Sequence, residues 1–117
     1  MARAWNTVVE TREYLADASR VLTLAQRDDV KTVLAIDPSC GAVIAGTGGL
    51  RKLRVAASGR GKRGGARAIY YFYNSTRPVF LLAIFAKNEK DDLSSTERKV
   101  LSQFVMALHQ QPKGTKR

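Results

Sequence analysis

The chain has 117 residues, a hydrophobic fraction of 44% and a formal net charge of +10. This length suits one domain with one core, so residues 1–117 are treated as a single domain. The hydrophobic fraction excludes a wholly disordered protein. No apolar run approaches the roughly 20 residues that span a bilayer, so we expect no membrane association. The single cysteine, Cys40, permits no internal disulfide, and Arg3 and Glu10 interrupt any signal-peptide core; both features favour the cytoplasm.

The first part of the chain predicts a strand followed by two helices. A β-prone segment at 5–9 opens it. Thr11 then caps a first helix, whose apolar side chains recur at helical spacing. They are Tyr14, Leu15, Ala18, Val21 and Leu22. Thr23 and Gln26 form a capping box that starts a second helix, which ends before Pro38. Its expected buried residues are Val30, Val33 and Leu34.

From residue 50 the apolar period changes from 3.6 to 2, which predicts antiparallel strands after a loop at 41–49. The expected strands span 50–57, 66–73 and 79–86. The last of them is apolar on both faces, which favours a place at the sheet's centre. A second capping box, Ser94 to Glu97, predicts a final helix before a basic tail at 112–117. Its expected buried stripe is Val100, Leu101, Phe104, Val105 and Leu108. The predicted fold class is α+β.

The positive charge is concentrated in the middle of the chain. Residues 38–88 contain nine basic side chains and no acidic one. The nine are Arg51, Lys52, Arg54, Arg60, Lys62, Arg63, Arg67, Arg77 and Lys87. Because this stretch lacks carboxylates, we expect its cations to find their counter-charge on an external polyanion. A merely soluble basic face would normally mix both signs.

Two apparent nucleotide motifs lack the required context. Residues 59–64 match the dinucleotide fingerprint G-x-G-x-x-G, but they lie between two predicted strands and open no helix. Residues 41–47 imitate a phosphate-binding loop without its lysine. One histidine and one distant cysteine give no metal-ligand spacing. The sequence therefore predicts neither a metal nor a small-molecule cofactor.

Four cations are expected to converge on one face of the sheet. Lys52 and Arg54 alternate along one strand, Arg67 comes from the partner strand, and Lys87 from the end of the last strand. A lysine crowded by other cations loses its proton more easily and can act as a general base, while arginines clamp phosphoryl oxygens. RNA supplies its own nucleophile, the 2′-hydroxyl. The set therefore suits a metal-independent endoribonuclease, and its spacing fits a passive phosphate-binding face equally well.

Further RNA contacts are expected around this set. They are Arg51, Arg60, Lys62, Arg63, Tyr71 and Lys90. Tyr71 offers a ring on which a base could stack. The glycine-rich segment 58–65 is expected to be a mobile connection, so its three cations are assigned to affinity rather than to proton transfer.

Several segments of this region resemble the RelE/HigB family of type II toxins, and its HigB-type branch most closely. They are Gly46–Val55, Gly59–Arg67, Ile69–Tyr71, Leu81–Leu82, Ala86–Lys90 and Asp92–Leu93. In the order of its elements the resemblance extends over about residues 5–110. It implies a RelE/ParE-like fold with an N-terminal strand, a helical hairpin, an antiparallel sheet and a C-terminal helix. It also implies a ribosome-dependent endonuclease that cleaves mRNA in the A site and is inhibited by a cognate antitoxin.

The resemblance also implies roles for the four catalytic candidates. Lys52 and Arg54 match the family's paired basic positions, and Arg67 matches the arginine that contacts the scissile phosphate. Lys87 matches a basic position at the end of the last strand. On this basis Lys52 is the general base, Arg54 and Arg67 stabilise transition-state charge, and Lys87 assists the leaving group or a phosphate.

The chain departs from RelE at two positions, which leaves the general acid unassigned. Asn88 stands where RelE has an arginine general acid, and Ser94 stands where it has a catalytic tyrosine. Two other functions remain alternatives: a ParE-like toxin that targets gyrase, and a non-catalytic RNA-binding module. The joint presence of Lys52, Arg54 and Arg67 favours the nuclease, because a gyrase-targeting toxin needs no phosphate clamp on that face.

Overall fold

The computed structural model describes residues 5–56, 65–90 and 92–110. Its elements are β1 (Val8–Glu10), α1 (Arg12–Val21), α2 (Leu24–Ile36), β2 (Ala42–Val43), β3 (Leu50–Val55), β4 (Ala66–Tyr71), β5 (Val79–Ala86) and α3 (Ser95–Gln110). The predicted α+β class, with a strand, a helical hairpin, a sheet and a final helix, is confirmed. The basic tail at 112–117 lies outside the described residues. No helix in the described part of the chain is long and apolar enough to cross a membrane.

The helices begin where the sequence predicts because their first turns are capped by nearby side chains. The Thr11 hydroxyl accepts from the Tyr14 amide at the start of α1. Both capping boxes form, each with reciprocal bonds between its two members: Thr23 with Gln26 at α2, and Ser94 with Glu97 at α3.

The sheet has five strands in the order β1-β5-β4-β3-β2. Strands β2 to β5 pair antiparallel, as predicted, whereas β1 pairs parallel to β5. The Thr11 hydroxyl fixes the junction between β1 and α1, because it donates to the Leu81 carbonyl of β5 at 2.8 Å while it caps α1. Helix α1 therefore follows β1 directly and packs against β5. The sheet is thus mixed: the three strands predicted to be antiparallel are so, and β1, for which the sequence predicts no direction, is parallel.

The predicted loop at 41–49 contains a short strand, β2, which forms a hairpin with β3. Thr47 closes the turn, since its buried hydroxyl donates to the Ile44 carbonyl and accepts from the Leu50 amide. Gly46, Gly48 and Gly49 have positive φ angles there, a conformation that glycine adopts without strain. Strand β4 ends at Tyr71 rather than at residue 73, because Leu50, the first residue of β3, is its last partner on that side.

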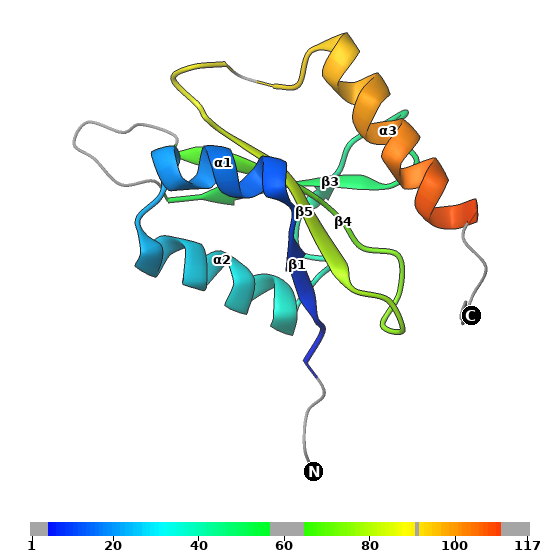
Figure 1. Cartoon of the computed structure of the whole chain (residues 1–117), viewed down its shortest axis with the longest axis horizontal. Helices are drawn as coiled ribbons and strands as arrows, with labels where there is room; N and C mark the ends of the chain where they lie inside the picture. The colour runs from blue at the N-terminus through cyan, green and yellow to red at the C-terminus, as the bar shows by residue number, and fades with distance from the viewer. Residues whose placement is uncertain (1–4, 57–64, 91, 111–117) are drawn as a thin grey trace.

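Helices cover both faces of the sheet (Figure 1). One core lies between the α1–α2 hairpin and the sheet and includes Tyr14, Ala18, Leu34, Tyr70 and Leu81. The other lies under α3 and includes Leu50, Ile69, Tyr71, Leu93 and Val105. Strand β4 is buried along its whole length and is the middle strand of the sheet. The expectation that β5 is the central strand is therefore corrected: the central strand is β4, and β5 is the interior strand next to it.

Two residues predicted to be buried are exposed. Val33 on α2 and Val100 on α3 retain 43% and 57% of their accessible surface. Each lies at the margin of its helix's apolar stripe. On α3 the contacts with the sheet are made by Val105 and, around it, Leu101, Phe104 and Leu108.

Two buried tyrosines differ in how their hydroxyl groups are satisfied. Tyr70 donates to the Pro38 carbonyl and accepts from the Gly41 amide, both at 2.8 Å. A Cβ atom at Gly41 would lie 2.7 Å from the Tyr70 hydroxyl oxygen, so only glycine fits at this corner between α2 and β2. Tyr14 is equally buried, yet its hydroxyl has no hydrogen-bond partner among the described residues. Desolvation raises the pKa of both tyrosines to about 12.

The Tyr70→Phe variant should destabilise the fold far more than Tyr14→Phe. Removing the Tyr70 hydroxyl leaves a buried amide and a buried carbonyl without their partner, which costs about 1–3 kcal/mol. Removing the Tyr14 hydroxyl breaks no hydrogen bond with the described residues. Thermal unfolding followed by circular dichroism should show a Tm lower by at least ~4 °C for Tyr70→Phe only. Equal losses in the two variants would contradict this account of the corner.

Candidate functional site

The register between β3 and β4 brings three of the predicted catalytic residues onto one face. Arg54 and Arg67 are directly paired across the two strands, and Lys52 is paired with Ile69. Directly opposed residues in an antiparallel pair project to the same face, and Ile69 packs in the core under α3. Lys52, Arg54 and Arg67 therefore share the α3 face of the sheet.

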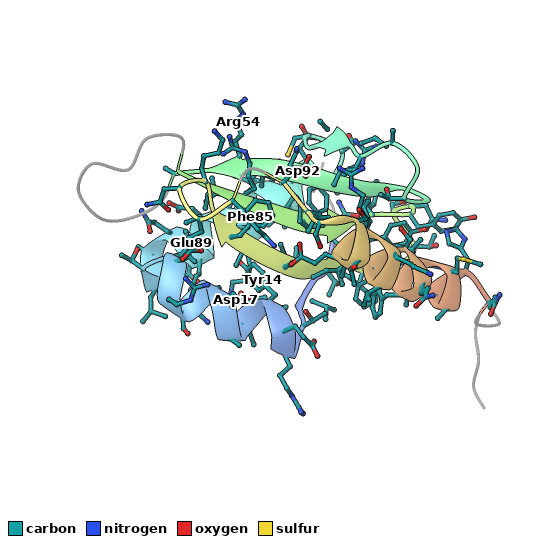
Figure 2. The ribbon with its side chains drawn as sticks, turned by 90° about the horizontal axis from the view of Figure 1, so that it is seen from above. Tyr14, Asp17, Arg54, Phe85, Glu89 and Asp92 are labelled. Atoms are coloured by element: carbon teal, nitrogen blue, oxygen red, sulfur yellow. The ribbon has the colours of Figure 1, made fainter. Side chains whose placement is uncertain are left out.

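The two arginines of this set differ in their surroundings. Arg67 retains only 6% of its accessible surface, lies opposite Phe85 of β5, and donates from Nη1 to the Ala66 carbonyl at 3.2 Å. Arg54 is exposed, and Figure 2 shows its side chain extending away from the sheet. Within the described part of the chain, no hydrogen bond or ion pair holds the Arg54 guanidinium. The site thus combines an anchored guanidinium with one that is open to a ligand.

Lys52 has an internal counter-ion, which corrects the expectation that the cations of this region need an external one. Its ammonium lies 3.3 Å from Oδ2 of Asp92, a residue of the connection between β5 and α3. The same oxygen lies 3.4 Å from Nη2 of Arg98 on α3. The Leu93 amide donates to the other carboxylate oxygen at 2.8 Å. This backbone bond first, and then the two cations, hold the pKa of Asp92 below its usual range.

Lys87 lies at the same end of the sheet as Arg54 and Arg67. Ala86 is opposite Ala66, and the Lys87 amide donates to the Gly65 carbonyl at 2.9 Å. The segment that joins β3 to β4 leaves the sheet at this end too. The predicted phosphate contacts Arg60, Lys62 and Arg63, and the predicted mobility of that segment, lie outside the described residues.

The three other predicted RNA contacts are engaged within the fold. Arg51 donates from Nη1 to the Ser39 and Gly41 carbonyls, which fastens the α2–β2 connection to β3. Lys90 contacts the Glu97 carboxylate at 2.5 Å and lies 5.0 Å from the centre of the Phe85 ring.

Tyr71 is placed under α3 rather than on the surface. Its ring is buried, and its hydroxyl is hydrogen-bonded to Nε2 of His109 at the end of α3. Its pKa is raised by burial and then by the neighbouring Tyr73. The exposed ring of this aromatic run is Tyr73, which contacts His109 edge-on and has the Arg77 guanidinium 5.0 Å from its centre. A base could therefore stack on Tyr71 only if α3 moved.

Acidic groups lie between α1 and the cationic face, which is the face formed by Lys52, Arg54 and Arg67. A pocket of about 250 Å³ lies there above Phe85, and its rim includes Asp17, Arg20 and Glu89. Figure 2 shows Asp17 on α1 and Glu89 on the connection after β5, both on the α1 side of the molecule. Arg20 and Glu89 form an ion pair at 2.6 Å across it. This ion pair occupies the Arg20 guanidinium on the α1 side of the connection, whereas the exposed Arg54 lies on the β3 side.

Sequence reasoning missed Asp92 and Arg98. The capping box at Ser94 marks where α3 begins, but no local pattern shows that this end of the helix packs over β3. Among the described residues, no group of three or more His, Cys, Asp or Glu side chains is placed to hold a metal ion.

Comparison with known proteins places this architecture in a family. The family described as the RelE toxin of the RelE/RelB toxin–antitoxin system matches residues 11–113. The chain belongs to the RelE toxin family. It is thus a toxin of a toxin–antitoxin system. Among solved structures, it is similar to a mutant of the Escherichia coli toxin RelE in the free state, with a TM-score of 0.56 and 15% sequence identity. The match covers 89% of this chain and 99% of that one, which confirms the RelE-like fold.

The ion pair at the start of α3 should make the stability of this RelE-family toxin depend on pH. The Lys90 ammonium, and then the Ser94 amide, hold the pKa of Glu97 below its usual range. A carboxyl whose pKa is lower in the folded state contributes stability above its unfolded pKa and loses it as the pH falls through the folded one. In Glu97→Gln the side-chain oxygen can still accept from the Ser94 amide, but the ion pair with Lys90 is lost. The Tm should therefore fall by roughly 2–4 °C at pH 7.

The difference between wild type and Glu97→Gln should disappear as the pH falls below about 4. Thermal melts from pH 7 to pH 3 provide the measurement. Glu13→Gln is the matched control, because Glu13 also lies in a first helical turn but forms no ion pair with the described residues. A difference that stays constant across this range would show that the Glu97 charge contributes nothing.

Proposed function

We propose that this toxin is a ribosome-dependent endoribonuclease that cleaves mRNA in the A site and so inhibits translation. The observation that carries the proposal is the cross-strand placement of Lys52, Arg54 and Arg67 on one face of a RelE-family chain. A face with an exposed arginine beside a buried one suits a phosphodiester whose charge grows in the transition state.

The reaction that fits these groups needs no nucleophile from the protein. The RNA 2′-oxygen attacks the adjacent phosphorus, the bond from phosphorus to the 5′-oxygen breaks, and a 2′,3′-cyclic phosphate and a free 5′-hydroxyl result. The proton of the 2′-hydroxyl passes to a base, for which Lys52 is the candidate, and the leaving 5′-oxygen gains a proton. Arg54 and Arg67 stabilise the charge on the phosphoryl oxygens. Lys87, at the same end of the sheet, assists the leaving group or a flanking phosphate.

The remaining cations are assigned to binding. Arg60, Lys62 and Arg63 contribute affinity for ribosomal or messenger phosphates, and Lys90 could do so only after leaving Glu97. Each phosphate contact makes binding more sensitive to salt without adding sequence preference.

The partner implied by the family is a cognate antitoxin, and the proposed compartment is the cytoplasm, where ribosomes and message meet. An acidic or helical antitoxin segment would suit the cationic face by charge complementarity. The HigB-type branch remains a prediction from the sequence segments that resemble it.

Purified toxin and translating ribosomes test the proposal directly. Primer extension on the message should show breaks within the codon in the A site. Breaks in free RNA without ribosomes would leave a nuclease but remove the ribosome dependence. Stalled gyrase on DNA with intact message would support the ParE-like alternative, and ribosome binding without breaks would support a passive RNA-binding module.

Arg54→Gln should reduce cleavage without unfolding the chain. Loss of one charge-stabilising donor lowers a rate by about 100-fold or more, and the exposed Arg54 side chain contributes nothing to either core. Single-turnover cleavage at saturating toxin, together with the Tm, provides the measurement. Arg12→Gln is the control, since Arg12 is also an exposed arginine and lies on α1. An unchanged rate for Arg54→Gln would remove Arg54 from the active site; the buried Arg67 makes a poorer test, because its loss also disturbs packing.

A further inference from the structure

Asp92 holds two cations of the α3 face with a single oxygen. Its Oδ2 lies 3.3 Å from the Lys52 ammonium and 3.4 Å from Nη2 of Arg98. Its Oδ1 is occupied separately, by the Leu93 amide at 2.8 Å. Figure 2 shows Asp92 on the same side of the molecule as Arg54. One anionic oxygen therefore bridges an ammonium on β3 and a guanidinium on α3.

A phosphate oxygen would make the same contact with Arg98. Ammonium and guanidinium groups are the usual partners of phosphate, and a guanidinium can donate two parallel bonds to it. Arg98 uses only Nη2 toward Asp92, and its buried Nε has no hydrogen-bond partner among the described residues. The Asp92 carboxylate therefore accepts from only part of the Arg98 guanidinium.

The contact is also open to exchange. The side chains of Lys52, Asp92 and Arg98 retain 28%, 39% and 41% of their accessible surface. Ion pairs with this exposure contribute little stability, because water and salt screen them. An incoming polyanion can therefore replace the carboxylate without unfolding either element.

We propose that Arg98 forms a phosphate-binding subsite, beside Lys52, that Asp92 occupies in the free toxin, so that RNA must displace Asp92 from both side chains to bind there. The inference rests on the proposed function, since it assigns one more contact of the same RNA path. It adds Arg98 to the RNA-binding residues. It makes Asp92 an internal competitor whose negative charge lowers the affinity of the free toxin for its substrate.

The test compares Asp92→Asn with Glu89→Gln. Both changes remove one negative charge from the connection between β5 and α3, and the two acidic side chains are similarly exposed, at 39% and 46%. Glu89 pairs with Arg20 on α1 instead of with Lys52. Asparagine keeps an oxygen that can accept from the Leu93 amide. If Asp92→Asn has a much lower Tm than wild type, Asp92→Ser replaces it, because serine keeps a hydroxyl acceptor.

The probe is a ribosome programmed with an mRNA whose A-site codon carries 2′-deoxyribose, which cannot be cleaved through the 2′-oxygen. Asp92→Asn should bind about two- to fivefold more tightly than Glu89→Gln. The log–log salt slopes of the two variants should be alike, because RNA makes the same phosphate contact in both once Asp92 has left Arg98. In Asp92→Asn/Arg98→Gln the gain in affinity should be lost and the slope should be shallower by about 0.7, because the subsite then lacks its guanidinium and one phosphate contact is missing.

The outcomes separate the inference from the proposed function. If wild-type toxin binds the programmed ribosome and cleaves normal message, but Asp92→Asn matches Glu89→Gln in affinity, the inference is wrong and the proposed function stands. A gain in affinity that persists after Arg98→Gln would also overturn the inference, because it would reflect net charge alone. If wild-type toxin neither binds nor cleaves on ribosomes, the proposed function fails first.

Discussion

The structure depends on one constraint: strand β4 is buried on both faces, between the α1–α2 hairpin and α3. Small side chains at Ala66 and Ala68 let the hairpin approach one face, and Ile69 and Tyr71 fill the space under α3 on the other. A strand in this position has room for a charged side chain only near the end of the sheet. Arg67 lies there, opposite Phe85, so the same packing that stabilises the fold also orients a guanidinium.

Much of this architecture follows from local sequence patterns. The capping boxes at Thr23 and Ser94 involve partners three positions apart, so the sequence predicts where α2 and α3 begin. The alternation in β3 predicts that Lys52 and Arg54 share a face, and the hairpin with β4 adds Arg67. These features need only the period of a strand and one antiparallel pairing.

What could not be predicted depends on contacts between distant segments. The parallel pairing of β1 follows from the Thr11 bond to Leu81, and the extent of β2 follows from its register with β3. Asp92 reaches Lys52 only because α3 packs across the sheet. A count of charges along the chain therefore overstated how exposed the cations are, and the buried Tyr71 shows the same limit for aromatic residues.

The direct pairing of Arg54 with Arg67 across β3 and β4 has a thermodynamic consequence. Like charges placed directly opposite each other in a sheet destabilise it, so this fold sacrifices some stability to hold two guanidinium groups together. Any anion that binds between them binds the folded chain and not the unfolded one, and by mass action it shifts the equilibrium toward the fold. If RNA binds there as proposed, the affinity of the toxin for RNA and its resistance to unfolding are linked. The free toxin would then be the form most exposed to unfolding and proteolysis, and a bound anion would protect it.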